Sequence, residues 1–186
     1  MRGSAPSFGI TTSIEVKTFP APPSVTVFAY TWKHLDAADA ANGIAAFQTF
    51  VQSDIPPQFG GEINLLKGSV PGTVYFELLG GWYGPENKLA DVLSPLLAQL
   101  PENPQVNLTS GTYLNSVMYL SGGSLNTTQP DTPNTFYAKS LMTPQSSPMS
   151  TKAINAFINY LANEGQNSTT VSFNSWCPII SKIENG

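Results

Sequence analysis

Two glutamates, Glu62 and Glu77, are candidates for acid–base chemistry in this sequence. A pair of carboxylates on neighbouring strands can cleave glycosides, so a hydrolase is one interpretation. The hydrolase interpretation is the weaker one, because carboxylates on strands usually face solvent. The sequence has one histidine, His34, and one cysteine, Cys177, and these lie far apart. An intramolecular disulfide is therefore excluded, and we predict no metal centre.

Charge and composition narrow the class of protein further. Charged residues make up 11% of the 186 residues, and the net charge is −4. Ordinary soluble domains carry about 25% charged residues. No basic run marks a nucleic-acid partner, and no apolar stretch approaches the ~18 residues that favour a membrane span. A polar surface built mainly from Ser, Thr, Asn and Gln is typical of secreted proteins, so we expect an extracellular location.

Three N-glycosylation sequons agree with secretion. They make Asn107, Asn126 and Asn167 candidate glycosylation sites. The first residues do not look like part of the domain. Met1 is followed by Arg-Gly-Ser, which resembles the leader left by an expression vector. We therefore assign residues 1–6 to a leader and find no signal peptide in it.

Hydrophobic periodicity predicts that strands and helices alternate in one domain. Residues 8–19 alternate apolar and polar side chains, as a half-buried strand does. Residues 58–67 and 73–82 predict a hairpin, because the segment between them contains two glycines and a proline. Further strands are predicted at 25–32, 105–109, 135–142 and 169–176, and helices at 36–52, 85–100, 113–120 and 150–165. We expect an α+β fold, with a mainly antiparallel sheet of about six to seven strands and helices packed on one face.

Several blocks of the sequence resemble one family of enzymes. Residues 7–23, SFGITTSIEVKTFPAPP, resemble the junction between the flavin-binding and substrate-binding domains of FAD-linked oxidases of the vanillyl-alcohol-oxidase and berberine-bridge type. Residues 73–83, which end in GGWY, and residues 135–141, TFYAKSL, are similar to strands of fungal glucooligosaccharide and chitooligosaccharide oxidases. The resemblance implies a single substrate-binding-type domain at 7–170, followed by a divergent tail at 171–186.

The resemblance also implies a chemistry, the oxidation of a sugar hydroxyl with FAD as the hydride acceptor. It places the flavin against Phe8, Gly9 and Ile10, where a glycine lets the backbone approach a flat ring. The family's tyrosine base, and the His and Cys that attach its flavin, come from segments that have no match here. We therefore expect that the isolated chain holds no cofactor and that oxidation needs the absent FAD-binding domain.

For the sugar itself, the resemblance implies three binding residues, which are Glu62, Tyr119 and Lys139. Each also has a simpler interpretation. Glu62 could decorate a solvent-facing strand, Tyr119 could belong to the core, and Lys139 could be an exposed strand lysine. Three further aromatic residues fit the core or a domain interface better than a sugar site: Trp32, Trp82 and Tyr83.

Two functions remain from the sequence. The first is the carbohydrate-binding domain of an FAD-dependent oligosaccharide oxidase, which would not be catalytic as an isolated chain. The alternative is a stand-alone module that binds a glycan or another protein. In that case we expect a homodimer through the face that a flavin domain would cover, since such a face is more apolar than a monomer tolerates.

Overall fold

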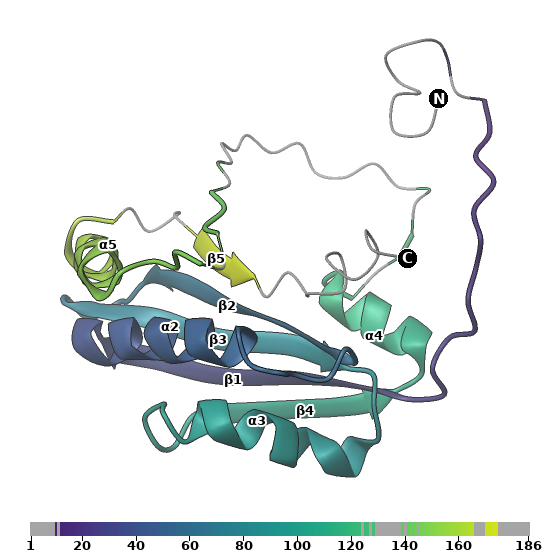
Figure 1. The fold of residues 1–186 in the computed structure, drawn as a ribbon, viewed down its shortest axis with the longest axis horizontal. Helices are drawn as coiled ribbons and strands as arrows, with labels where there is room; N and C mark the ends of the chain where they lie inside the picture. The colour runs from purple at the N-terminus through teal and green to yellow at the C-terminus, as the bar shows by residue number, and fades with distance from the viewer. Residues whose placement is uncertain are drawn as a thin grey trace.

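The computed structural model describes residues 10, 12–123, 125, 126, 128, 139, 141–144, 146–165 and 170–174. These residues contain one antiparallel sheet of five strands in the order β4-β1-β3-β2-β5 (Figure 1). The strands are β1 (Val25–Asp36), β2 (Phe59–Lys67), β3 (Thr73–Trp82), β4 (Gln105–Gly111) and β5 (Thr170–Asn174). The predicted α+β class and the mainly antiparallel sheet are confirmed, although the sheet has five strands where six to seven were expected.

The missing strand is the one predicted at residues 8–19. Its described residues, Ile10 and 12–19, form no strand, and the chain runs away from the sheet there (Figure 1). Its apolar side chains are exposed, for example Ile10 at 95% and Phe19 at 76%. An alternating pattern makes a strand only where a neighbouring strand pairs with it, and none of the five strands does so. The prediction at 135–142 falls mostly outside the described residues.

The helices are α2 (Ala37–Val51), the short 3-10 helix η1 (Glu86–Lys88), α3 (Leu89–Leu97), α4 (Tyr113–Leu120) and α5 (Thr151–Asn163). Of these helices, α2, α4 and α5 begin at a residue whose side chain caps the first turn, whereas η1 and α3 have no side-chain cap. The Asp36 carboxylate accepts the backbone N–H of Asp39 at 2.9 Å, and the Ser150 hydroxyl accepts that of Ala153 at 3.2 Å. Each contact satisfies a donor that the first turn of a helix leaves free.

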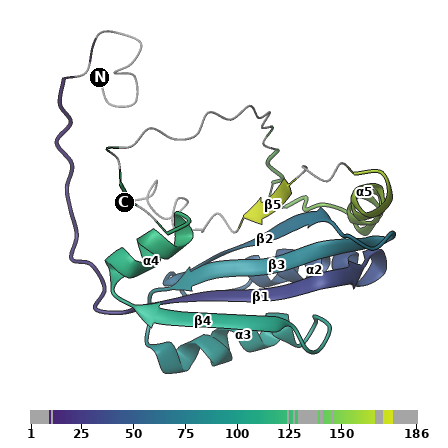
Figure 2. The same ribbon diagram turned by 180° about the vertical axis from the view of Figure 1, so that it is seen from behind.

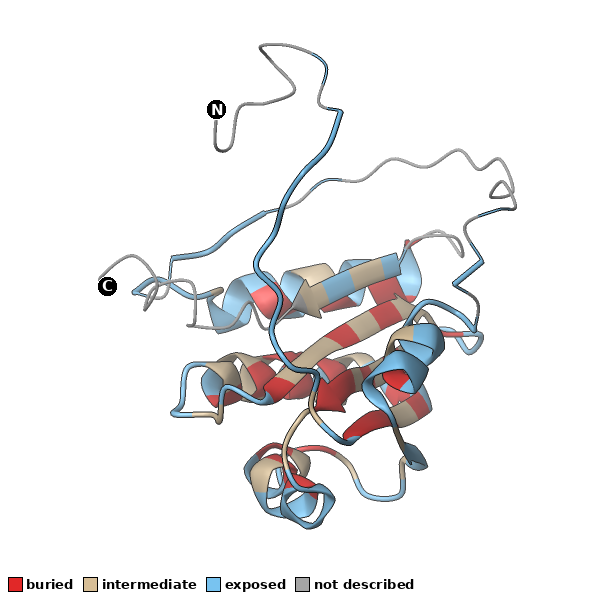
Figure 3. Ribbon diagram, turned by 90° about the vertical axis from the view of Figure 1, so that its right-hand side faces the viewer, coloured by how far each residue is buried: buried red, intermediate tan, exposed pale blue. Residues whose placement is uncertain are grey.

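One face of the sheet, the helix face, carries the core. Along β3 the side chains of Val74, Phe76 and Leu78 are fully buried, while the residues between them are only half-buried. The helix face packs against α2, α3 and α5, and Figure 3 shows the buried residues concentrated between these layers. Trp32 and Trp82 belong to this core, as expected, with 8% and 3% exposure.

Two glycines let β1, β2 and β3 approach closely on the helix face. The Phe28 ring lies over Gly80, where an added Cβ would come within 2.5 Å of that ring and 2.2 Å of the Gly60 carbonyl oxygen. Gly61, which pairs with Gly80, leaves room for Phe59, whose ring stacks on Phe28 at 5.7 Å. The pair of glycines therefore makes the space that two aromatic rings fill.

Helix α4 lies on the opposite face, at one end of the sheet (Figure 2). Its Tyr119 hydroxyl accepts a hydrogen bond from the Asn107 amide at 3.1 Å, and Asn107 pairs with Ala29. Val25 and Val27 share that face with Ala29 and are 1% and 2% exposed. Beyond this end none of the described helices lies over the face, and we call this part the open face.

Candidate functional site

A row of polar side chains crosses all five strands on the open face. Thr31 of β1 pairs with Gln105 of β4 and with Glu77 of β3, and Asn64 of β2 pairs with Glu77 and with Ser172 of β5. Each of the five side chains is half-buried or exposed. We call these residues the polar row. They offer hydroxyl, amide and carboxylate groups along one line, on a rigid sheet.

Glu77 is the centre of the polar row. Its Oε1 accepts a hydrogen bond from the Tyr75 hydroxyl at 3.0 Å and a longer one from Thr31 Oγ1 at 3.4 Å. Burial raises the pKa of Tyr75, and the neighbouring charge of Glu77 raises it further. Tyr75 therefore stays a neutral donor at ordinary pH, and Glu77 keeps one oxygen for another partner.

Asn64 joins the rest of the row to the predicted residue Glu62. Its Nδ2 donates to Glu62 Oε1 at 3.0 Å, and its Oδ1 accepts from Ser172 Oγ at 2.5 Å. These bonds fix the orientation of the Asn64 amide. Glu62 thus lies on the open face, one step along β2 from the polar row and on the strand next to Glu77.

The structure places Tyr119 on this face as well. The pairings Asn107–Ala29, Ala29–Leu79 and Leu79–Glu62 form the row next to the polar row, and Tyr119 contacts its Asn107 end. Tyr119 is 40% exposed, so its interpretation as a core residue is wrong. The third sugar-binding candidate, Lys139, is exposed and belongs to no described strand.

Some of the remaining predicted site residues lie in the described part of the structure, and others lie outside it. Tyr83 is half-buried and contacts the Tyr113 ring of α4, with 6.2 Å between the ring centroids. Of the residues proposed to lie against flavin, Ile10 is exposed, while Phe8 and Gly9 lie outside the described residues. Two of the glycosylation candidates, Asn107 and Asn126, are exposed, and the third, Asn167, also lies outside the described part.

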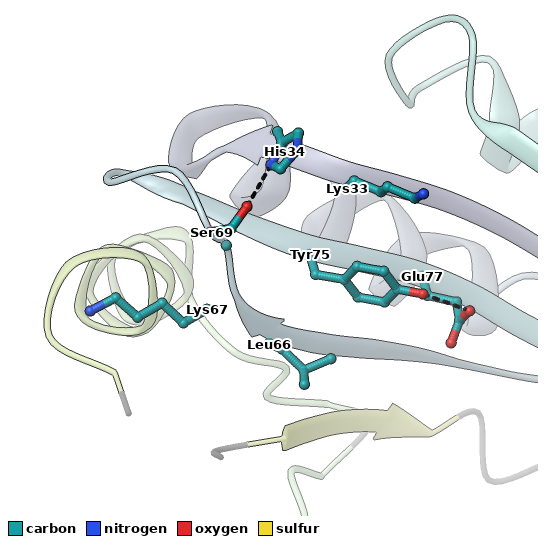
Figure 4. Close-up of a pocket in the computed structure, with 8 residues that line it drawn as sticks. Lys33, His34, Leu66, Lys67, Ser69, Tyr75 and Glu77 are labelled. Carbon is teal, nitrogen blue, oxygen red and sulfur yellow. Dashed lines mark hydrogen bonds between the residues drawn. The ribbon is translucent and has the colours of Figure 1, made fainter. Parts of the chain in front are cut away.

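A hollow of about 540 Å³ adjoins the polar row at the end of the sheet away from α4 (Figure 4). Its lining includes Tyr75 and Glu77 together with Lys33, His34 and Ser69. The hollow is shallow and widely open to solvent. The hollow therefore adjoins the polar row, and its own surface is more apolar than polar.

Sequence reasoning missed most of the polar row. Thr31, Asn64, Gln105 and Ser172 lie within the predicted strands, but none of them was singled out. The missing signal was register, because only the pairing of strands shows that these positions meet in one line. Once the 58–67 and 73–82 hairpin is accepted, however, the closing turn alone aligns Asn64 with Glu77.

Other kinds of site find no support in the part of the chain that the structure describes. No three His, Cys, Asp or Glu side chains gather there to hold a metal ion. Among the same residues, no helix has the length and apolar character needed to cross a membrane.

No protein-family model matches the chain, but individual relatives do. It is 25% identical over 175 residues to a chitooligosaccharide oxidase of Gibberella zeae, which covers 91% of this chain and 33% of the relative. It is 30% identical over 146 residues to a xylooligosaccharide oxidase of Thermothelomyces thermophilus, which covers 77% and 28%. The chain thus spans about a third of the length of the relatives it matches.

A solved structure agrees with these sequence relatives. A berberine-bridge-enzyme-like protein of Physcomitrella patens superposes with a TM-score of 0.69 at 22% identity, over 84% of this chain and 33% of that one. At this identity the match shows the fold. The homologues of this chain are therefore oligosaccharide and carbohydrate oxidases, and its fold is that of about a third of a berberine-bridge-enzyme-like FAD-linked oxidase.

Proposed function

We propose that this chain is the carbohydrate-binding part of an FAD-dependent oligosaccharide oxidase and that the open face is where the sugar lies. The observation that carries the proposal is the polar row, a line of hydrogen-bonding groups that extends over five paired strands. Two homologues, a chitooligosaccharide oxidase and a xylooligosaccharide oxidase, support a saccharide as the ligand.

The chemistry of the face suits a saccharide. Sugar hydroxyls need donors and acceptors, which the Asn64 amide and the Glu62 and Glu77 carboxylates provide. The C–H face of a sugar ring packs on aromatic rings, and Tyr75 and Tyr119 bring two to this face. In such an oxidase, FAD accepts the hydride when it is bound, while the residues of this chain bind and orient the sugar.

The direct test is a calorimetric titration of the chain with xylotetraose and with chitotetraose. The test variant is Asn64→Ala, and the matched control is Asn159→Ala, which removes an exposed amide of α5 outside the open face. We expect Asn64→Ala to weaken binding about tenfold, because it removes a hydrogen-bonding group worth roughly 1.4 kcal/mol. Asn159→Ala should bind like the unmodified chain. Equal losses in both variants would contradict the assignment of the sugar to the open face.

A second measurement addresses the cofactor. The chain is mixed with excess FAD, passed over a gel-filtration column and examined by absorption between 300 and 550 nm. We expect a colourless protein without oxidase activity. Retained flavin absorbance near 450 nm would mean that the chain binds FAD by itself, and the proposal of a sugar-binding part that depends on a separate flavin site would be wrong.

A second role, self-association, is favoured by one specific observation. Helix α4 exposes a set of apolar side chains, with Leu114 at 58% exposure, Leu120 at 43% and Met118 at 39%. An exposed apolar helix surface of this kind is typical of an interface. Light scattering should then give the mass of a dimer, and Leu114→Gln should return it to 19.9 kDa. A monomer mass for the unmodified chain would argue against this role.

A further inference from the structure

The hollow beside the polar row contains a β-bulge that changes the charge of this end of the open face. In β1, Trp32 pairs with Phe76 and Leu35 pairs with Val74, so both Lys33 and His34 oppose the single residue Tyr75. A bulge of this type bends the strand and re-aims the side chains it contains. Here it brings two basic side chains to the hollow together, where strict alternation would bring one.

Each of the other charged groups of the hollow has at least one hydrogen-bond partner. Glu77 accepts hydrogen bonds from Tyr75 and Thr31. The Lys67 ammonium group donates to the Asn163 carbonyl oxygen at 2.8 Å, and Figure 4 shows this side chain extending toward α5. The ring of His34 lies 3.5 Å from the Ser69 hydroxyl, measured from Nδ1 to Oγ.

Lys33 is the exception. Its ammonium group forms no hydrogen bond or ion pair with any residue that the structure describes, although it lines the same hollow as Glu77 and Tyr75. It therefore keeps three donors and a positive charge for a ligand. The Ser69 and Tyr75 hydroxyls beside it add neutral groups that a sugar can use.

A neutral sugar accepts a hydrogen bond from such a group, whereas a carboxylate accepts one and also neutralises its charge. Hydrogen bonds in which the donor or the acceptor is charged are roughly twice as strong as neutral ones, and a carboxylate adds the attraction of opposite charges. We infer that the hollow is a subsite for an acidic sugar unit, with Lys33 paired to the carboxylate of a uronic acid residue while the polar row binds the adjoining units. This inference rests on the proposed function, since it assigns the substrate class of the same face.

The test compares trigalacturonate, xylotriose and acetate as ligands of the full chain in calorimetric titrations. We expect trigalacturonate to bind about two- to fivefold more tightly than xylotriose, because Lys33 is exposed, and acetate to show no measurable binding. Raising the salt concentration from 0.05 to 0.5 M should weaken only the binding of trigalacturonate, because salt screens the added charge pair.

Three lysine variants then assign the preference to one group. Lys33→Gln should lower the affinity for trigalacturonate about two- to fivefold and leave that for xylotriose unchanged, whereas Lys33→Arg should retain the preference. Lys152→Gln, which removes an exposed lysine on α5, is the control and should change neither affinity.

The outcomes separate this inference from the proposed function. If xylotriose binds and Asn64→Ala weakens it, but trigalacturonate has no advantage, the acidic subsite is overturned and the sugar-binding face stands. The subsite is also overturned if Lys33→Gln and Lys152→Gln lose the same affinity, or if acetate binds as well as trigalacturonate. If neither trisaccharide binds, the proposed function fails, and the acidic subsite fails with it.

Discussion

The two faces of the sheet are made from the same strands and differ in almost every physical respect. On the helix face, Phe76 and Leu78 are fully buried under helices. On the open face, their neighbours Glu77 and Leu79 are half-buried and lie among hydrogen-bonding groups. Because side chains alternate along a strand, one segment of sequence can build a core and present a ligand surface at once. Stability should therefore depend on one face, and binding on the other.

The strongest test of this difference uses two adjacent leucines of β3. Leu78→Ala should lower the free energy of unfolding by about 2–5 kcal/mol, because it leaves a cavity in the core. Leu79→Ala should cost about 1 kcal/mol or less, since Leu79 is only half-buried on the open face. Urea unfolding followed by circular dichroism measures both values. Similar losses would mean that the open face is packed as tightly as the core, and the distinction between the faces would fail.

A substitution at Gly80 should have an effect on stability of intermediate size. Gly80→Ala should destabilise the chain by about 1–3 kcal/mol, because the new methyl group would meet the Gly60 carbonyl and the Phe28 ring. Gly60→Ala is the control, since its nearest neighbour would be the Gly81 carbonyl oxygen at 3.9 Å. We expect Gly60→Ala to change stability by less than about 1 kcal/mol. Thermal unfolding of both variants would show whether the helix face is as closely packed at the glycines as the structure indicates.

The smallest expected effect concerns alkaline pH. Burial raises the pKa of Tyr75 in the folded chain, so folding favours the neutral phenol. This contribution is fully present below the unfolded tyrosine pKa of about 10 and is lost as the pH rises through the higher folded value. Stability should therefore fall between pH 9 and pH 11, and less so in Tyr75→Phe than in the unmodified chain. If Tyr75→Phe loses as much stability as the unmodified chain, Tyr75 does not contribute in this way.

The sequence predicted the parts of the fold that depend on local signals. Asp36 and Ser150 mark helix starts, and the glycines of the segment between β2 and β3 mark a hairpin, so these elements were located within a few residues. The segment at 8–19 shows the limit of the same reasoning. Its alternation is as regular as that of β3, but a strand also needs a partner, and no local pattern supplies one.

The candidate site was predictable only in part, and for the same reason. Glu62 and Tyr119 were identified through resemblance, and both lie on the open face or contact it. The polar row and the bulge arise from pairing between distant strands, such as β5 with β2. The predicted boundary between the domain and its tail, at residue 170, falls within β5, so the first residues of that tail pair with the sheet.

The pairing of β5 with β2 has a consequence for the way this surface changes over evolutionary time. Ser172 completes the polar row from a five-residue strand at the edge of the described sheet, where it pairs with β2 alone, whereas Glu77 comes from a strand held on both sides. Replacing or shifting an edge strand disturbs fewer contacts than altering a central one. New ligand preferences can therefore arise at the β5 side of the row at little expense to folding, while the β3 side stays fixed by the core beneath it.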